Sequence, residues 1–375
     1  MTGGPAPART SPLALQLAQR IAREGPISVA DYMDACLHDP VHGYYRTRAA
    51  IGRAGDFITA PEISQVFGEL IGLWCAVVWR LMGEPARLRL VELGPGRGTL
   101  MRDVLRAART VPAFHAALEI ELVESNETLA AIQRATLESE SARLRWSAKL
   151  AAHADAVPAI VIANEFLDTL PVEQWARRGR WLQRRVGLDP AGQFVFVEGE
   201  PDAGVPPPQV AAAASDGDVL ETRAAAFAAW SARLAALGHP LAALFIDYGH
   251  AAPGLGDTLQ AVRAHRYEAA LAAPGEADLT AQVDFAAFAA AMAEHGLACD
   301  GPMTQAEFLG ALGIAERASR LMDANPARAA AIEGDVARLM APNGMGGRFQ
   351  AIGFKSRDVP PLPGLATMDR GASAP

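Results

Sequence analysis

The segment that decides the fold is Leu88-Arg-Leu-Val-Glu-Leu-Gly-Pro-Gly-Arg-Gly-Thr-Leu100. Its apolar run predicts a buried strand, and the glycines at 94, 96 and 98 predict a turn that leads directly into a helix. Glycine permits positive φ and lets a ligand touch the backbone, while the N-terminus of the following helix favours negative charge. In an open parallel sheet, ligands bind at this point, where a strand gives way to a helix.

Helices and strands alternate on both sides of this segment. A wide apolar stripe predicts a helix before it, and the order of elements after it is typical of a parallel sheet with helices on its faces. We therefore predict an α/β fold. The expected helices are Pro61–Leu81, Thr99–Arg109, Asn126–Glu138, Thr304–Leu312 and Ala315–Leu339, and the expected strands are Leu118–Val123, Ala159–Ala163, Leu241–Ile246 and Gly347–Phe354.

The alternation breaks after Val172, which predicts an insertion in one α/β sheet. Three short strands are expected there, at Trp175–Arg177, Arg180–Leu188 and Phe194–Val197, followed by a Pro- and Ala-rich linker. The predicted organisation is an N-terminal helical region (1–60), a first part of the core (61–173), the inserted β-rich subdomain with its linker (174–238), a second part of the core (239–356) and a flexible tail (357–375).

The composition excludes several classes of protein. Half of the 375 residues are hydrophobic and 20% are charged, which rules out a disordered chain. The formal charge of −8 makes nucleic acid a poor partner, because affinity for it comes from neutralising phosphates. The longest apolar run, Ile71–Trp79, is too short to span a bilayer, so no membrane association is expected. Three widely spaced cysteines indicate a reducing compartment, here the cytoplasm, and no metal site.

The N-terminus shows no secretory signal. Ser11 and Pro12 predict a capped helix, and Leu13, Leu17 and Ile21 recur along one face of it. We interpret this segment as a docking helix, although its arginines and late first acid also resemble a transit peptide. The helix docks either on the core or on a second subunit, so the sequence does not decide whether the protein forms a homodimer.

The glycine segment and two acids together indicate the kind of ligand. The spacing Gly94-Pro95-Gly96-x-Gly98 is GxGxG, whereas dinucleotide sites use GxGxxG. Glu92 precedes the glycines, and Glu124 ends the next strand, where a carboxylate can hold two ribose hydroxyls. This set resembles the motifs of class I S-adenosylmethionine (SAM) methyltransferases, whose cofactor has an ammonium group and a ribose but no pyrophosphate.

Over most of its length, about Pro26 to Ser356, the chain resembles the MidA-like methyltransferases, which include the mitochondrial complex I assembly factor 7. The resemblance implies a Rossmann-like SAM-binding core with an added N-terminal region and an insertion. It also implies a protein substrate: in mitochondria, the activity is symmetric dimethylation of an arginine in a complex I subunit, which would place a eukaryotic member in the matrix. The matching blocks are Gly55–Gln65, Val91–Thr99, Asn164–Pro171, Ile246–His250 and Ala277–Phe285.

The block Asn164-Glu165-x-x-Asp168 carries the predicted catalytic residues. It follows a buried strand, so it lies at the same sheet edge as the glycines. A guanidinium has a pKa above about 12, so carboxylates are needed to orient it and to accept its proton. Glu165 is expected to grip the substrate nitrogens, Asp168 to add a second clamp and Asn164 to hydrogen-bond either ligand. Alternatively, Asn164 and Asp168 only satisfy turn backbone.

Other motif residues are expected around the same edge. Asp56 and Phe57 are predicted to close over the cofactor, next to Thr59 as a helix cap. Trp146 would stack on the adenine unless it belongs to the core. The predicted substrate-binding residues are Tyr248, His250 and His265.

Alternatives remain for the acceptor and for catalysis itself. The glycine segment does not distinguish a protein acceptor from a small molecule or RNA, and a SAM-binding assembly chaperone without turnover would carry the same motifs. The insertion adds an arginine-rich stretch with two tryptophans, which permits an RNA interpretation or a protein partner. Alternating apolar residues on the same strand favour one buried and one solvated face instead.

Overall fold

The computed structural model describes residues 11–47, 58–151, 155, 157–201, 210 and 213–366. It divides into two compact units. The α/β unit contains residues 58–166, 227–251 and 285–375, and the β-rich unit contains residues 1–57, 167–226 and 252–284. Residues 252–284, which were predicted to belong to the second part of the core, are therefore part of the β-rich unit.

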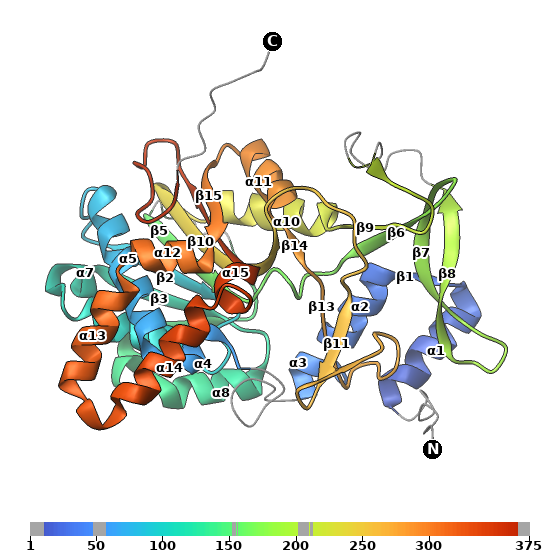
Figure 1. Cartoon of the computed structure of the whole chain (residues 1–375), viewed down its shortest axis with the longest axis horizontal. Helices are drawn as coiled ribbons and strands as arrows, with labels where there is room; N and C mark the ends of the chain where they lie inside the picture. Colours follow the sequence, from blue (N-terminus) through green and yellow to red (C-terminus); the bar gives the residue numbers. More distant parts are fainter. Residues whose placement is uncertain are drawn as a thin grey trace, which may run out of the picture. The chain divides into compact units, whose positions relative to one another are not determined.

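The α/β unit contains the predicted parallel sheet (Figure 1). The strand order along it is β15-β16-β10-β5-β2-β3-β4. Pairing is parallel from β10 to β4 and antiparallel at β16 and β15. The bounds are β2 (Leu88–Leu93), β3 (Leu118–Val123), β4 (Leu144–Ser147), β5 (Ala159–Asn164), β10 (Leu241–His250), β15 (Ala298–Thr304) and β16 (Phe349–Lys355).

The register of the parallel strands aligns their carboxyl ends. Leu93, the last residue of β2, pairs with Val123 of β3 and with Ala163 of β5. Asn164, which ends β5, pairs with Ile246 of β10. The residues that follow these strands therefore emerge along one edge of the sheet, as the sequence pattern predicted.

Helices cover both faces of this sheet. On one face, the apolar sides of α5 (Gln65–Leu81) and α6 (Thr99–Ala108) join the strands in one core cluster. On the other face, Phe227 of α10 (Ala224–Ala235) and Phe288 of α11 (Phe285–Glu294) form ring contacts that include Phe245 and Phe354 of the sheet. This double cover explains why β2, β5 and most of β10 are buried on both faces.

The remaining helices of the α/β unit differ from the prediction at one place. The long helix predicted over 315–339 is two helices, because Asn325 and Pro326 interrupt it and a short 3-10 turn follows. The bounds are α4 (Ala60–Ile63), α7 (Pro112–Ala117), α8 (Glu127–Thr136), α12 (Gln305–Ala311), α13 (Ile314–Ala324), α14 (Ala329–Met340) and α15 (Met345–Arg348).

The predicted flexible tail is wrong for residues 357–366. Val359, Leu362 and Leu365 are buried in the main core cluster. The backbone is also fixed, because Asp300 accepts a hydrogen bond from Leu362 N (2.8 Å) and pairs with Lys355 (2.6 Å). Three apolar side chains at short intervals were the signal that the Pro- and Gly-rich composition obscured.

The β-rich unit contains two antiparallel sheets. The three strands predicted in the insertion are β6 (Glu173–Arg178), β7 (Arg180–Leu188) and β8 (Phe194–Pro201). They pair with β1 (Ile27–Ser28) and β9 (Val219–Thr222), in the order β1-β7-β6-β9 with β8 beside β7. A second sheet, which the sequence did not reveal, has the order β12-β11-β13. Its strands are β11 (Gln260–Arg263), β12 (Arg266–Glu268) and β13 (Asp278–Thr280).

The N-terminal helices belong to the core of the β-rich unit. The predicted cap of the first helix is confirmed, since Ser11 accepts from Ala14 N (3.1 Å). Ser28 likewise accepts from Asp31 N (2.9 Å) at the start of the second helix. The buried face of the first helix packs into a core shared with the inserted strands. The helices are α1 (Pro12–Glu24), α2 (Val29–His38) and α3 (Tyr44–Thr47). Within the described ranges, no helix combines the length and apolar character needed to cross a membrane.

The contact between α5 and α6 gives a test of the fold. A Cβ atom added to Gly72 of α5 would lie 2.6 Å from the Val104 carbonyl oxygen of α6. We expect Gly72→Ala to lower the free energy of unfolding by about 1–3 kcal/mol, because backbone cannot give way as a flexible side chain does. Gly334→Ala, in the exposed α14 with open space around it, should instead raise it by up to about 1 kcal/mol. Chemical denaturation measures both, and equal effects would contradict this packing.

Candidate active site

The glycine segment after β2 forms a tight turn in the left-handed region. Gly94, Gly96 and Gly98 have φ values of 61°, 54° and 79°. Gly98 N donates to the Pro95 carbonyl oxygen (2.8 Å), and Gly98 is the N-cap of α6. A side chain at these positions would strain the backbone. The segment therefore offers backbone groups, and not side chains, to a ligand.

Glu92 is a buried acid at the carboxyl end of β2. Its side chain has 3% exposure, and its Oε2 atom has no hydrogen-bond partner among the residues that the structure describes. Burial raises the pKa of Glu92 to about 8, opposed by the Met101 backbone N–H and increased by the nearby Glu124. An unsatisfied buried carboxyl oxygen that directly precedes the glycine turn fits the ammonium group of an amino-acid ligand.

Glu124, Gly96 and Trp146 come together around a residue that the sequence analysis missed. Gln133 of α8 donates from Nε2 to the Gly96 carbonyl oxygen (2.8 Å) and to Glu124 Oε2 (3.2 Å). Its Oε1 accepts from the Trp146 indole N–H (2.9 Å). The other oxygen of Glu124 accepts from Asn126 N (2.7 Å). The available signal was a glutamine on the apolar face of a predicted helix.

The start of α6 is associated with a carboxylate and not with a phosphate site. Glu62 of α4 accepts a hydrogen bond from the Thr99 hydroxyl, at the first residue of α6. In dinucleotide-binding folds, this helix end faces a pyrophosphate. A protein carboxylate in that place disfavours a phosphate by charge repulsion. The site therefore fits a ligand without phosphate groups, such as SAM.

Asn164 and Glu165 follow β5 at the same edge. Glu165 has φ +53°, a conformation that costs energy in a residue with a side chain. Its Oε1 accepts from Asn164 Nδ2 (2.9 Å) and from Ala60 N (3.2 Å). The predicted side-chain cap by Thr59 is absent, and Glu165 supplies an acceptor to the N-terminus of α4 instead. Asn164 Oδ1 is buried and unpartnered among the described side chains and backbone.

The end of β10 orders the loop that carries Glu165. Asp247 is buried and accepts from Phe166 N (2.9 Å) and Tyr248 N (2.9 Å). Tyr248 and His250 follow it at the carboxyl edge of the same strand, and the Tyr248 ring packs against Phe349. Asp247 lies within the matching block Ile246–His250, but its positioning role was not predicted from the sequence.

Two predicted site residues belong to the β-rich unit. Asp168 is buried, and its carbonyl oxygen accepts from Ala281 N (3.1 Å) and from Arg223 (3.3 Å). His265 lies at the turn between β11 and β12 with φ +60°. Their position relative to Glu165 stays a prediction. Asp56 and Phe57 lie outside the described residues.

The arginine-rich strands of the insertion are paired with acids. Arg184 contacts Asp257 (2.6 Å) and lies over the Phe196 ring, and Arg178 contacts Glu198 (3.0 Å). These contacts neutralise part of the positive charge of the inserted strands and so weaken the RNA interpretation. Within the described ranges, no group of three or more histidine, cysteine or acidic side chains is placed to hold a metal ion.

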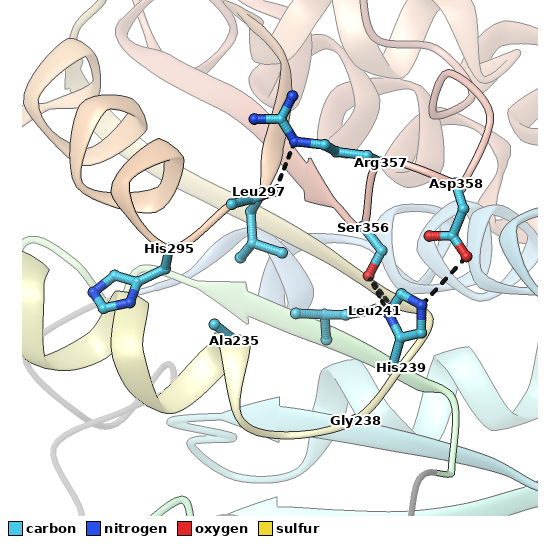
Figure 2. Close-up of a pocket in the computed structure, with 10 residues that line it drawn as sticks. Ala235, Gly238, His239, Leu241, His295, Leu297, Ser356, Arg357 and Asp358 are labelled. Carbon is cyan, nitrogen blue, oxygen red and sulfur yellow. Dashed lines mark hydrogen bonds and ion pairs between the residues drawn. The ribbon is translucent and has the colours of Figure 1, made fainter.

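A cavity of about 450 Å³ lies at the opposite edge of the sheet, where β10 begins (Figure 2). His239 approaches Ser356 Oγ (3.2 Å) and Asp358 (3.4 Å), which superficially matches a Ser-His-Asp triad. Ser356 Oγ, however, accepts from Leu241 N (2.9 Å), and the His239 and Asp358 side chains are 68% and 59% exposed. We interpret the three residues as a clasp that joins the end of β16 to the start of β10.

Comparison with known proteins identifies the family. A family model described as "Putative S-adenosyl-L-methionine-dependent methyltransferase" matches residues 70–303. The chain belongs to this family. Zebrafish (Danio rerio) "Protein arginine methyltransferase NDUFAF7, mitochondrial" is 35% identical over 89% of this chain and 84% of the relative. The human protein of the same name is 34% identical over 92% and 83%.

A solved structure extends the match to the whole fold. A Burkholderia thailandensis protein bound to S-adenosyl-homocysteine is 30% identical, with a TM-score of 0.84 over 97% of both chains. The expected MidA-like family, the Rossmann-like fold and the SAM cofactor are thereby confirmed. In this methyltransferase, SAM fits the glycine turn and the buried Glu92. It also fits the start of α6, where the Glu62 carboxylate disfavours a phosphate group.

The glycine turn gives a direct test of cofactor binding. We expect Gly96→Val to abolish binding of S-adenosyl-homocysteine in calorimetry, because a β-branched side chain at φ +54° would distort the turn whose backbone is expected to contact the ligand. Gly83→Val is the matched control, since Gly83 has φ +86° with open space around it. It imposes the same backbone strain elsewhere and should retain binding. Equal affinity in the two variants would contradict the placement of the cofactor.

The pKa of Glu92 makes a second prediction. An acid whose pKa is raised in the folded state lowers the free energy of unfolding as the pH rises. The decrease takes place between the pKa of the unfolded state, near 4.5, and that of the folded state, about 8. Glu92→Gln should therefore gain stability relative to wild type between pH 5 and pH 9, by about 2 kcal/mol or more, while losing cofactor affinity. Glu127→Gln, at an exposed acid of α8, is the control. A pH-independent difference in unfolding free energy would refute the buried-carboxyl interpretation.

Proposed function

We propose that this methyltransferase transfers a methyl group from SAM to an arginine side chain of a protein. The observation that carries the proposal is the placement of Glu165, a carboxylate held directly after β5 at the sheet edge that also carries the glycine turn. A guanidinium needs such a group, because it must be oriented and must lose a proton.

The cofactor half of the site uses residues of the α/β unit. The backbone of the segment 94–98, including Pro95, would contact the amino-acid end, with Glu92 serving its ammonium group. Glu124 would accept the ribose hydroxyls, and Trp146 would stack on the adenine, its indole N–H already held by Gln133. Asp56 and Phe57 stay predicted to close over the cofactor. When bound, SAM supplies a methyl group already activated by its sulfonium.

The acceptor half follows β5 and β10. Glu165 would hold the guanidinium through paired N–H donors. Asn164 Oδ1, which has no partner among the residues that the structure describes, would accept a further N–H. The attacking nitrogen would form a bond to the methyl carbon as the bond between sulfur and that carbon breaks and S-adenosyl-homocysteine leaves, and the carboxylate would take up the proton that the nitrogen releases. Asp168, Tyr248, His250 and His265 would complete the binding of the acceptor.

The relatives support a protein acceptor. Several curated relatives are named protein arginine methyltransferases and mitochondrial proteins, and the chain covers 83–84% of the zebrafish and human sequences. We infer a subunit of respiratory complex I, or a protein like it, as the substrate. The compartment would be the mitochondrial matrix in a eukaryote and the cytoplasm in a bacterium.

Substitution of Glu165 tests the acceptor role. Glu165→Gln keeps an oxygen that can accept from Ala60 N, so α4 should remain in place. We expect turnover of an arginine peptide to fall about 10²–10⁴-fold, with unchanged affinity for S-adenosyl-homocysteine. The assay follows labelled methyl groups and identifies the product by mass spectrometry, with an Arg-to-Lys peptide as the substrate control.

Two results would redirect the assignment. Full activity of Glu165→Gln would restrict Glu165 to capping α4. Saturable cofactor binding with no methyl transfer to any protein of a matched lysate would favour the binding-only chaperone instead. Glu127→Gln, at an exposed acid, should leave both binding and turnover at wild-type levels.

A further inference from the structure

We propose that Gln133 is a positioning residue that prearranges the nucleoside half of the SAM site. The inference rests on the proposed cofactor site, but not on the identity of the methyl acceptor. Gln133 lies on α8, in none of the sequence blocks that define the family resemblance. Its side chain is fully buried, with 0% exposure.

The Gln133 amide has a defined orientation. Nε2 donates to the Gly96 carbonyl oxygen (2.8 Å) and to Glu124 Oε2 (3.2 Å), and Oε1 accepts the Trp146 indole N–H (2.9 Å). A flipped amide would place two oxygens against each other and two donors against each other, so this network permits one arrangement. Each partner belongs to a different strand end or turn of the proposed cofactor site.

Gln133 also lies near the last glycine of the turn. A Cβ atom built on Gly98 would lie 3.5 Å from both Cα and Cγ of Gln133, so a side chain at position 98 would meet it directly. The three hydrogen bonds of one side chain thus connect the turn, the ribose carboxylate and the adenine-facing indole.

This arrangement determines what Gln133 contributes to binding. The carboxylate of Glu124 is held by Gln133 on one oxygen and by Asn126 N on the other, so it is oriented before the ribose arrives. Without Gln133, ligand binding itself would have to order these groups, which lowers affinity but leaves the methyl-transfer geometry intact once the cofactor is bound. The effect should therefore fall on cofactor affinity and KM, and not on kcat.

The test compares Gln133→Met with Gln305→Met in the full-length protein. Gln305 is also buried in the α/β unit with 0% exposure, and its Nε2 donates to the Leu339 carbonyl oxygen (2.9 Å). Each variant therefore replaces a fully buried amide of the same unit, but within the described residues the Gln133 side chain forms three hydrogen bonds and that of Gln305 forms one. We expect Gln133→Met to weaken binding of S-adenosyl-homocysteine about 10-fold or more in calorimetry, because a hydrogen bond to a charged group is lost. Gln305→Met should bind like wild type, and equal affinities in the two variants would overturn the proposal.

A second variant covers the case in which Gln133→Met does not fold. Gln133→Glu keeps the shape but sets a carboxylate against Glu124 and the Gly96 carbonyl oxygen. We expect its affinity, as a ratio to wild type, to recover several-fold as the pH falls from 8 to 6, because protonation restores a donor. A ratio independent of pH would contradict the role of Gln133. If the wild-type protein did not bind S-adenosyl-homocysteine, the proposed cofactor site itself would be refuted. If the wild-type protein bound S-adenosyl-homocysteine but methylated no arginine, only the proposed methyl acceptor would be refuted.

Discussion

The alignment of parallel strand ends is the constraint on which the rest of this structure depends. Leu93, Val123 and Ala163 share one level of the sheet, and the strand after them, β10, is aligned through Asn164 and Ile246. Each strand is buried on both faces, so its register is fixed by packing along its whole length. Residues 30 or more positions apart are therefore brought to one edge without any direct interaction between them being required.

Polar groups at this edge are either tightly partnered or poised for a ligand. Asp247 and Gln133 satisfy backbone and side-chain groups of the loops, which costs little because every bond replaces one to water. Glu92 is a buried acid whose second oxygen, like Asn164 Oδ1, has no partner among the described residues. Burial of such a group is unfavourable, and its raised pKa records that cost. A bound ammonium would relieve it, which links the stability of the site to its ligand.

Glu165 combines a structural contact with the proposed chemical one. It supplies an acceptor for the first turn of α4, while Glu62 of α4 accepts from Thr99 at the start of α6. Through α4, the Glu165 carboxylate, which is proposed to bind the methyl acceptor, is connected to α6, the helix that begins at the glycine turn. The left-handed backbone of Glu165 is held by this network and by Asp247, which accepts a hydrogen bond from the backbone N–H of the next residue, Phe166.

The sequence by itself determined the sheet, the glycine turn and the acids at two strand ends, because these depend on local periodicity and on the conformational freedom of glycine. It also carried the family resemblance in short contiguous blocks. Only the tertiary structure identified Gln133 and Asp247 as the residues that hold the site, placed residues 252–284 in the β-rich unit and packed the segment 357–366 into the core. The reason is physical: a buried amide or a packed proline-rich segment is defined by its partners, and those partners are distant in the chain.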